Sequence, residues 1–134
     1  MRLVLDTNVV VSALINPGGK PSQIMKMIFS RKAELYCNSI ILNEYETVML
    51  RPKFANKIHS GNVRRLIDII RKIGISFNPF PGDTKLSDES DQIFYDTARG
   101  SGSILISGNI KHFPKEPFIM LPADFLKWFE GGKR

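Results

Sequence analysis

A carboxylate, a hydroxyl and a carboxamide follow one another directly after a short apolar run near the start of the chain. The run is Leu-Val-Leu at 3–5, and the polar residues are Asp6, Thr7 and Asn8. Such a run predicts a buried strand of a parallel sheet, with a helix at 9–15 after it. Ligands of open α/β folds bind at the carboxyl ends of the strands, where these oxygen ligands would lie. The same residue types are good helix N-caps, so this stretch alone leaves both interpretations open.

Further polar side chains are expected at the same edge of the sheet. Glu44 and Asp91 lie early in helices that follow predicted strands, and Ser107 and Asn109 directly follow another strand. Because a helix that follows a parallel strand starts at the carboxyl edge, all these groups would share one rim. Three acids there would repel one another unless a cation neutralised them. Carboxylate and carboxamide oxygens suit Mg²⁺ or Mn²⁺ better than Zn²⁺ or copper.

Each of these residues also has a purely structural interpretation. Asp88 would cap a helix, and Asp91 would be a first-turn acid that the helix dipole favours. Glu44 would pair with a lysine on a solvated face, and Asn109 would form a turn. Their joint placement on one rim favours the metal site over four independent structural roles.

The surrounding chain alternates between strand and helix signals. Helical spacing of apolar residues and capping residues predict helices at 9–15, 23–32, 40–50, 60–73, 88–99 and 122–129. Short apolar runs predict strands at 3–5, 34–37, 75–77, 103–106 and 117–120. This alternation indicates an α/β fold with a parallel sheet and helices on both faces. The length of 134 residues fits one domain, of which the last four residues are expected to be loose.

Composition excludes several classes of protein. No apolar run approaches the 18 or so residues of a membrane span, and no signal peptide opens the chain. The single Cys37 cannot form an internal disulfide, which favours the reducing cytoplasm. The absence of Cys/His clusters argues against a structural zinc site.

Charge is unevenly distributed along the chain. The net charge of +6 favours a polyanionic partner. Residues 51–72 carry seven basic side chains and one acid, whereas residues 83–96 carry five acids and one lysine. The acidic segment within a basic protein favours a cation site inside a positive surface, although charge runs are more often solvated helix faces.

Four segments together resemble one known family. They are LDTNV at 5–9, LNEY with LRPKF at 42–54, DESDQIFYDTA at 88–98, and ILISGNIKHFP at 104–114. In order and spacing they resemble the PIN domain (PilT N-terminus) family of metal-dependent nucleases, over nearly the whole chain. Within that family the chain is most similar to prokaryotic toxin components of toxin–antitoxin pairs. The resemblance implies a three-layer α/β/α fold whose sheet of four or five strands has the order 3-2-1-4-5.

The resemblance also implies roles for individual residues. The metal-holding acids of the family fall on Asp6, Glu44 and Asp91. Asp91 is preferred to Asp88 because the family's acid stands seven residues before a small helix residue, here Ala98. The supporting residues of the site are Thr7, Asn8, Asp88, Asp96 and Ser107, the last of which stands where the family has a hydroxyl beside the first acid.

Asn109 departs from the pattern of many relatives, which have a fourth acid at its position. As a fourth metal ligand it supplies one negative charge fewer, so a second ion would bind more weakly. Asp96 stands five residues beyond Asp91, too far round a helix to share its face closely, and is a secondary candidate.

The sequence therefore predicts a Mg²⁺- or Mn²⁺-dependent endoribonuclease of the cytoplasm, without membrane association. Phosphate contacts are expected from Lys20, Arg51, Lys53 and Lys111. The resemblance implies a homodimer and a small antitoxin as partner. Two other functions stay open: a silent RNA- or protein-binding module of the same fold, and a phosphatase with Asp6 as nucleophile, in which Asn8 would stand where a second acid is wanted.

Overall fold

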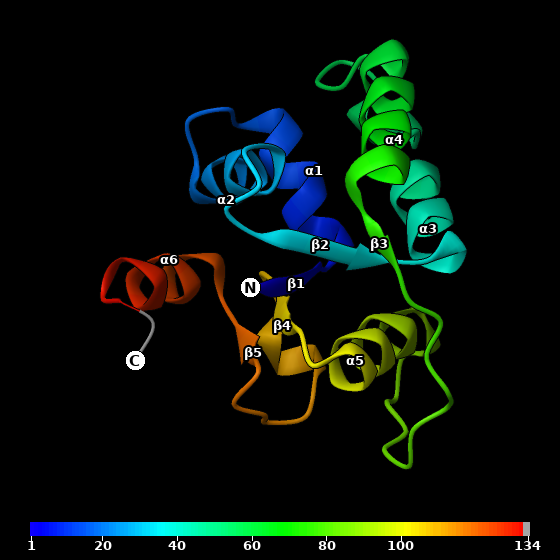
Figure 1. Ribbon diagram of the computed structural model, residues 1–134. Helices are drawn as coiled ribbons and strands as arrows, with labels where there is room; N and C mark the ends of the chain where they lie inside the picture. Colours follow the sequence, from blue (N-terminus) through cyan, green and yellow to red (C-terminus); the bar gives the residue numbers. More distant parts are fainter. Residues whose placement is uncertain (133–134) are drawn as a thin grey trace.

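Five parallel strands form the centre of the molecule, in the order β3-β2-β1-β4-β5 (Figure 1). The computed structural model describes residues 1–132. The strands are β1 (Arg2–Leu5), β2 (Glu34–Cys37), β3 (Ile75–Ser76), β4 (Ile104–Ile106) and β5 (Ile119–Met120). The central strand β1 pairs Leu3 with Leu35 of β2 and Leu5 with Ile106 of β4. The predicted parallel sheet and its strand order are confirmed.

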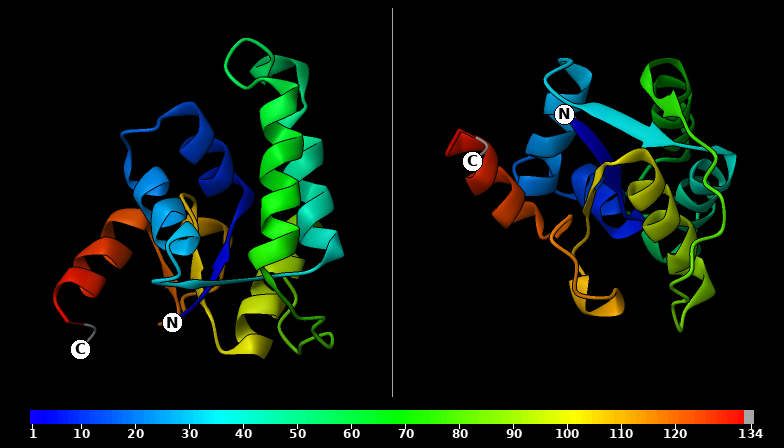
Figure 2. Two further views of the ribbon diagram at one scale, coloured as in Figure 1. Left: turned by 45° about the horizontal axis from the view of Figure 1, so that its top comes forward. Right: turned by 60° about the horizontal axis from the view of Figure 1, so that its bottom comes forward.

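Helices cover both faces of this sheet. They are α1 (Thr7–Ile15), α2 (Lys20–Phe29), α3 (Ser39–Met49), α4 (Ser60–Ile73), α5 (Glu89–Ser101) and α6 (Pro122–Glu130), with the short 3₁₀ helices η1 (Pro52–Phe54) and η2 (Ile110–His112). In Figure 1, α1 to α4 lie above the sheet and α5 lies below it, against β1, β2 and β4. α6 packs beside α2, and the arm formed by α3 and α4 projects from the sheet (Figure 2). The three-layer α/β/α architecture is therefore confirmed.

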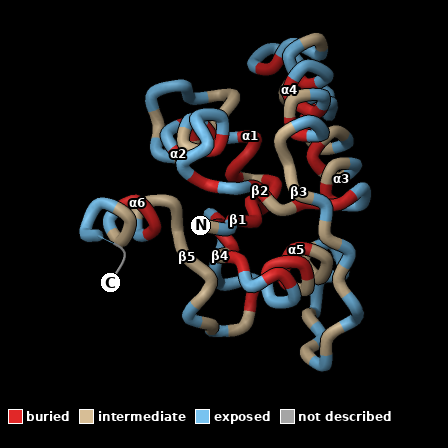
Figure 3. Tube along the Cα trace, viewed as in Figure 1, coloured by how far each residue is buried: buried red, intermediate tan, exposed pale blue. Residues whose placement is uncertain are grey.

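The core lies between the sheet and these two helical layers (Figure 3). Leu3, Val4 and Leu5 of β1 are fully buried, because a central parallel strand is covered on both faces. Each such side chain stabilises the fold by about 1.5 to 3 kcal/mol relative to an exposed one. Tyr45 of α3 is also fully buried, and its hydroxyl donates a hydrogen bond to the Leu5 carbonyl at 2.5 Å. This bond ties the helix that carries Glu44 to the end of the strand that precedes Asp6.

Several predicted boundaries shift by a few residues. The helix expected at 23–32 spans 20–29 instead, because Pro21 stands in its first turn and Arg31 adopts a left-handed φ of 67° beyond its end. The strand expected at 75–77 ends at Ser76. Neither 3₁₀ helix was predicted: η1 begins at Pro52, just beyond the helix predicted at 40–50, and η2 follows the polar turn after β4.

The ends of the described chain add two observations. Within residues 1–132, none of the helices is both long and apolar enough to cross a membrane. Of the four C-terminal residues predicted to be loose, Gly131 and Gly132 form a turn, and residues 133–134 lie outside the described residues.

Candidate functional site

Asp6 lies at the carboxyl end of β1 and is held by three donors. Its Oδ1 accepts the Thr7 backbone N–H at 2.8 Å, so Asp6 is the N-cap of α1. Its Oδ2 accepts the Ser107 hydroxyl at 2.7 Å and the Asn8 side-chain amide at 3.3 Å. The residue as a whole is 6% exposed. The helix-cap interpretation of the sequence is thus confirmed, and the capping residue also lines the cleft described below.

Sheet topology brings Ser107 to Asp6 across 101 residues of sequence. β1 and β4 are neighbours, and the strand order reverses between them, which is where open α/β sheets bind ligands. The Asn109 backbone N–H donates to Ser107 Oγ at 2.9 Å, which leaves the hydroxyl hydrogen free to point at Asp6. Asn8 Oδ1 accepts the Gly108 N–H at 2.9 Å and so braces the turn. Asp6 is held in one orientation by this network.

The three predicted acids line one cleft of about 470 Å³. Asp6 comes from the β1–α1 junction, Glu44 from α3 and Asp91 from the first turn of α5. Basic side chains, Arg51, Lys53 and His112, line the same cleft. Elements from both layers and both halves of the chain thus bring the acids to one rim, as the sequence predicted.

Asp91 has the most strongly shifted pKa of the three acids in the cleft. Its side chain is 13% exposed, and its Oδ2 is buried without a hydrogen-bond partner among the described residues. Burial, followed by the negative charges of Asp6 and Asp88, raises the pKa of Asp91 to about 6. Burial also raises the pKa of Asp6, against the lowering effect of its hydrogen bonds. Two acids that resist ionisation side by side favour a cation between them.

The donor set fits a hydrated divalent cation rather than a closed protein cage. In the part of the chain that the structure describes, no three His, Cys, Asp or Glu side chains are grouped closely enough to enclose an ion. Mg²⁺ usually keeps several waters and is held by one or two carboxylates, which an open cleft of this kind permits. Asp91 Oδ2 and Thr7 Oγ1 are buried oxygens that make no hydrogen bond within residues 1–132, and both line the cleft. Asp6, Glu44 and Asp91 are therefore the residues that would hold such an ion.

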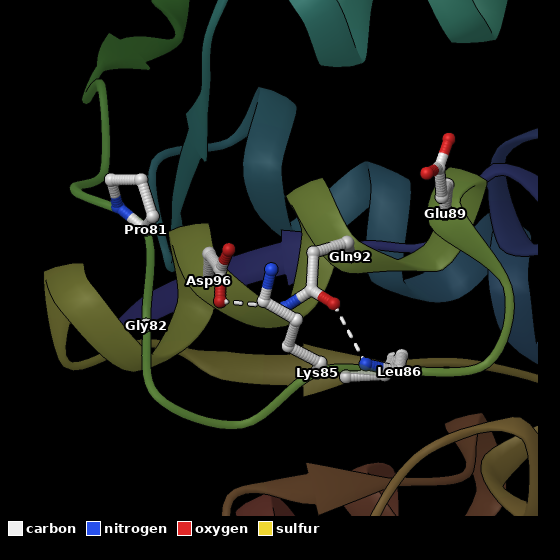
Figure 4. A pocket seen from close by; sticks show the side chains of 7 residues that line it. All are labelled: Pro81, Gly82, Lys85, Leu86, Glu89, Gln92 and Asp96. Carbon is white, nitrogen blue, oxygen red and sulfur yellow. Dashed lines mark hydrogen bonds between the residues drawn. The ribbon is translucent and has the colours of Figure 1, made fainter.

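The remaining acids of α5 lie elsewhere. Asp88 is exposed and caps α5, accepting the backbone N–H of Ser90 at 2.9 Å, and its helix-cap interpretation is confirmed. Asp96 lines a separate pocket under the 78–88 loop and accepts a hydrogen bond from Gln92 Nε2 at 3.1 Å (Figure 4). Gln92 Oε1 in turn accepts the Leu86 N–H at 2.8 Å. Asp96 thus helps to hold this loop and is not among the residues that line the acidic cleft.

Of the residues expected to contact phosphate and of Asn109, the expected fourth ligand, some line the cleft and others do not. Arg51 and Lys53 line the cleft, and Lys111 is exposed in η2 beside it. Lys20 begins α2, beyond the end of α1 that lies away from the rim, and α1 is about 13 Å long. Asn109 is exposed, and only its backbone N–H joins the network through Ser107.

Among the lining residues to which the sequence gave no role, His112 and Phe54 lie beside predicted site residues. His112 has its Nδ1 3.7 Å from Asp91 Oδ2, and the Phe54 ring centroid lies 5.0 Å from Lys53 Nζ. Both belong to 3₁₀ helices, which have no strong sequence signal. In the sequence, the only indication that His112 belongs to the site was its position directly after Lys111, an expected phosphate contact.

A parallel sheet of this order, with carboxylates gathered where the strand order reverses, has the arrangement in which open α/β proteins place a ligand site. The family model described as "PIN domain" matches residues 2–111, and the chain belongs to the PIN domain family. An uncharacterized protein from Methanocaldococcus jannaschii, MJ1680, is 35% identical over 112 residues, which cover 81% of this chain and 71% of the relative. The crystal structure of VapBC2 from Rickettsia felis, bound to a DNA fragment from their promoter, contains a chain of similar fold with a TM-score of 0.59. That match has 15% sequence identity and covers 90% of this chain and 97% of the other.

Proposed function

We propose that this protein is a Mg²⁺- or Mn²⁺-dependent endoribonuclease that hydrolyses single-stranded or loop RNA. The observation that carries the proposal is the cleft in which Asp6, Glu44 and Asp91 meet, with a buried Asp91 oxygen that has no hydrogen-bond partner in the described chain. Membership of the PIN domain family supports a nuclease. The net charge of +6 supports a polyanionic substrate.

The residues of the cleft have distinct tasks in this proposal. Asp6, held by Thr7 and Ser107, is a ligand of fixed orientation. Asp91 offers an oxygen that no donor in the described chain satisfies, and Glu44 faces the cleft from α3. When bound, the cation supplies a water of lowered pKa and neutralises charge on the phosphate.

Basic side chains that line the cleft and its rim would bind the RNA backbone. Arg51 and Lys53 line it directly, and Lys111 stands on the adjoining rim. A substrate phosphate between these cations and the acids would have its scissile bond next to the cation. Attack by water at phosphorus with the 3′-oxygen as leaving group would leave a 5′-phosphate and a 3′-hydroxyl, and the 2′-hydroxyl would take no part.

We further propose that the protein is the toxin of a toxin–antitoxin pair and acts in the cytoplasm as a homodimer. The resemblance to toxin components and the fold shared with a VapBC2 chain support this assignment. A small antitoxin would block the enzyme most simply by placing an arginine or lysine among the acids, where it would replace the cation. Inspection of the neighbouring reading frames for a small partner tests this part of the proposal.

The two alternatives predict different results. In the phosphatase alternative Asp6 forms a covalent phosphate, but Asn8 is used to brace the Gly108 turn and adds no acid beside Asp6. Trapping of an aspartyl phosphate would favour that function. In the silent-module alternative, suggested by Asn109 in place of an acid, RNA binds and is not cleaved with any divalent metal.

Metal removal is the direct test of the nuclease proposal. Cleavage of a generic single-stranded RNA should require added Mg²⁺ or Mn²⁺ and fall to background in EDTA, because three acids without a cation repel the phosphate. Gel analysis of RNA with a labelled 5′ end measures this, and restoring the metal should restore cleavage. Robust cleavage in EDTA would contradict the assignment of the site.

Lys111 provides a test of the RNA-binding surface. Lys111→Ala should weaken binding of RNAs of different sequence by a similar factor and reduce the salt dependence of binding by about one ion, as loss of one phosphate contact does. Fluorescence anisotropy at several salt concentrations measures both quantities. The matched control is Lys32→Ala, because exposed Lys32 precedes β2 at the opposite edge of the sheet. A loss restricted to one RNA sequence would instead make Lys111 a base contact.

A further inference from the structure

His112 faces the acids of the cleft although it is not one of the expected metal ligands. Its Nδ1 lies 3.7 Å from Asp91 Oδ2, and the imidazole lines the same cleft as Asp6 and Glu44. The side chain is 57% exposed, so it has room to rotate. It is close enough that a positive charge on the imidazole lowers the pKa of both Asp6 and Asp91. An imidazole thus lies beside two carboxylates of the cleft whose pKa values are raised by burial.

The distance between His112 Nδ1 and Asp91 Oδ2 fits two ligands of one cation better than it fits a hydrogen bond. A distance of 3.7 Å is too long for a hydrogen bond, and Asp91 Oδ2 has no hydrogen-bond partner anywhere in residues 1–132. Two donors that bind one ion, each about 2.1 Å from it, lie about 3 to 4 Å apart. The pair is therefore spaced as two ligands of a shared cation, and the buried Asp91 oxygen has no hydrogen bond in residues 1–132 that such an ion would have to displace.

Asn109 is less well placed for the same task. It is exposed, its backbone N–H is used to orient Ser107, and it is not among the residues that line the cleft. η2 begins at the next residue and turns the chain so that His112, three positions later, faces Asp91. Because of this 3₁₀ helix, the imidazole of His112 lines the cleft and the carboxamide of Asn109 does not.

We propose that His112 is a direct ligand of the cation, paired with Asp91, and that it makes the site prefer Mn²⁺ to Mg²⁺. The inference rests on the proposed metal-dependent function. An imidazole nitrogen binds transition metals well, whereas Mg²⁺ prefers oxygen ligands and gives up its waters reluctantly. A site of oxygen ligands alone would lack this source of preference for Mn²⁺.

Pulsed electron paramagnetic resonance of the Mn²⁺-loaded protein tests this ligand directly. A histidine nitrogen bound to Mn²⁺ modulates the electron spin echo, and ¹⁵N-histidine labelling changes the modulation pattern in a way that assigns it to histidine. The parent should show this change. His112→Ala should lose the histidine modulation, and its Mn²⁺ affinity in calorimetric titration should fall about tenfold or more, with a smaller change for Mg²⁺.

The chain offers a matched control because it has only one other histidine. His59 caps α4 by accepting the Gly61 N–H at 3.0 Å, and His59→Asn keeps a capping side chain. This variant should retain the full modulation and the full Mn²⁺ affinity of the parent.

The possible outcomes separate this inference from the proposed function. Mn²⁺ binding by the parent without histidine modulation, or modulation that persists in His112→Ala, overturns the inference and leaves the nuclease proposal intact. Equal losses of Mn²⁺ and Mg²⁺ affinity in His112→Ala overturn the claimed preference. Failure of the parent to bind Mn²⁺ at all contradicts both the inference and the proposed metal dependence.

Discussion

Asp91→Asn is expected to abolish RNA cleavage and, at neutral pH, to stabilise the metal-free protein. The parent holds an ionised Asp91 whose Oδ2 is buried without a hydrogen bond from the described residues and whose neighbours Asp6 and Asp88 are also acids. Asparagine has an uncharged amide of the same size, so the substitution removes the negative charge at position 91 and its repulsion by Asp6 and Asp88. The rise in the pKa of Asp91 from 3.8 to about 6 corresponds to a loss of at most about 3 kcal/mol in the free energy of unfolding at neutral pH. After screening by solvent, we expect Asp91→Asn to raise the free energy of unfolding by about 1 kcal/mol.

The pH dependence of this effect has a definite sign. Because the pKa of Asp91 is raised from 3.8 to about 6, the folded protein binds more protons than the unfolded chain between these values. The parent therefore loses stability as the pH rises through this window, and the loss levels off at about pH 7. The Asp91→Asn variant should lose less stability over the same range, so its advantage should be present at pH 7.5 and small at pH 4.

Denaturant unfolding in EDTA at the two pH values measures the difference. Asp96→Asn is the matched control on the same helix, because Asp96 lies outside the cleft and an asparagine oxygen can still accept from Gln92. This control should retain cleavage and show no comparable gain at neutral pH. An Asp91→Asn variant that remains active would contradict the proposed site at its centre.

Asp6→Asn should also be inactive, but with the opposite effect on stability. The two oxygens of Asp6 accept from Thr7, Ser107 and Asn8, and an asparagine would turn its own NH₂ group towards two of these donors. The lost hydrogen bonds should outweigh the relief of repulsion and destabilise the metal-free protein by about 1 kcal/mol. Added Mn²⁺, which should raise the melting temperature of the parent, should raise that of the variant much less.

A double-mutant cycle identifies the Ser107 bond as the cause. Ser107→Ala alone leaves Asp6 Oδ2 with the weaker Asn8 contact at 3.3 Å. The double variant Asp6→Asn/Ser107→Ala should be more stable than the sum of the single effects predicts, because the two residues share one hydrogen bond. Additive effects, measured by thermal unfolding in EDTA, would show that Ser107 does not support Asp6.

Local signals in the sequence were sufficient for much of the fold. The Leu-Val-Leu run at 3–5 is a central strand because only buried parallel strands are apolar on both faces. Asp88 caps α5 as predicted, and α4 spans the predicted residues 60–73. These features depend on residues within one or two turns of each other. Strand order followed from the resemblance to PIN domains and is confirmed by the sheet.

The site depended on contacts that no local pattern contains. Ser107 reaches Asp6 across 101 residues only because β4 pairs with β1, and the pKa of Asp91 is high because packing buries one of its oxygens. His112 faces Asp91 because η2, a 3₁₀ helix without a strong sequence signal, turns the chain after Asn109. The sequence by itself placed Asp6 at a strand end and Glu44 and Asp91 early in helices, since strand ends and helix starts are local signals. Tertiary structure decided how those side chains are buried, hydrogen-bonded and paired, since each of these properties requires segments from distant parts of the chain.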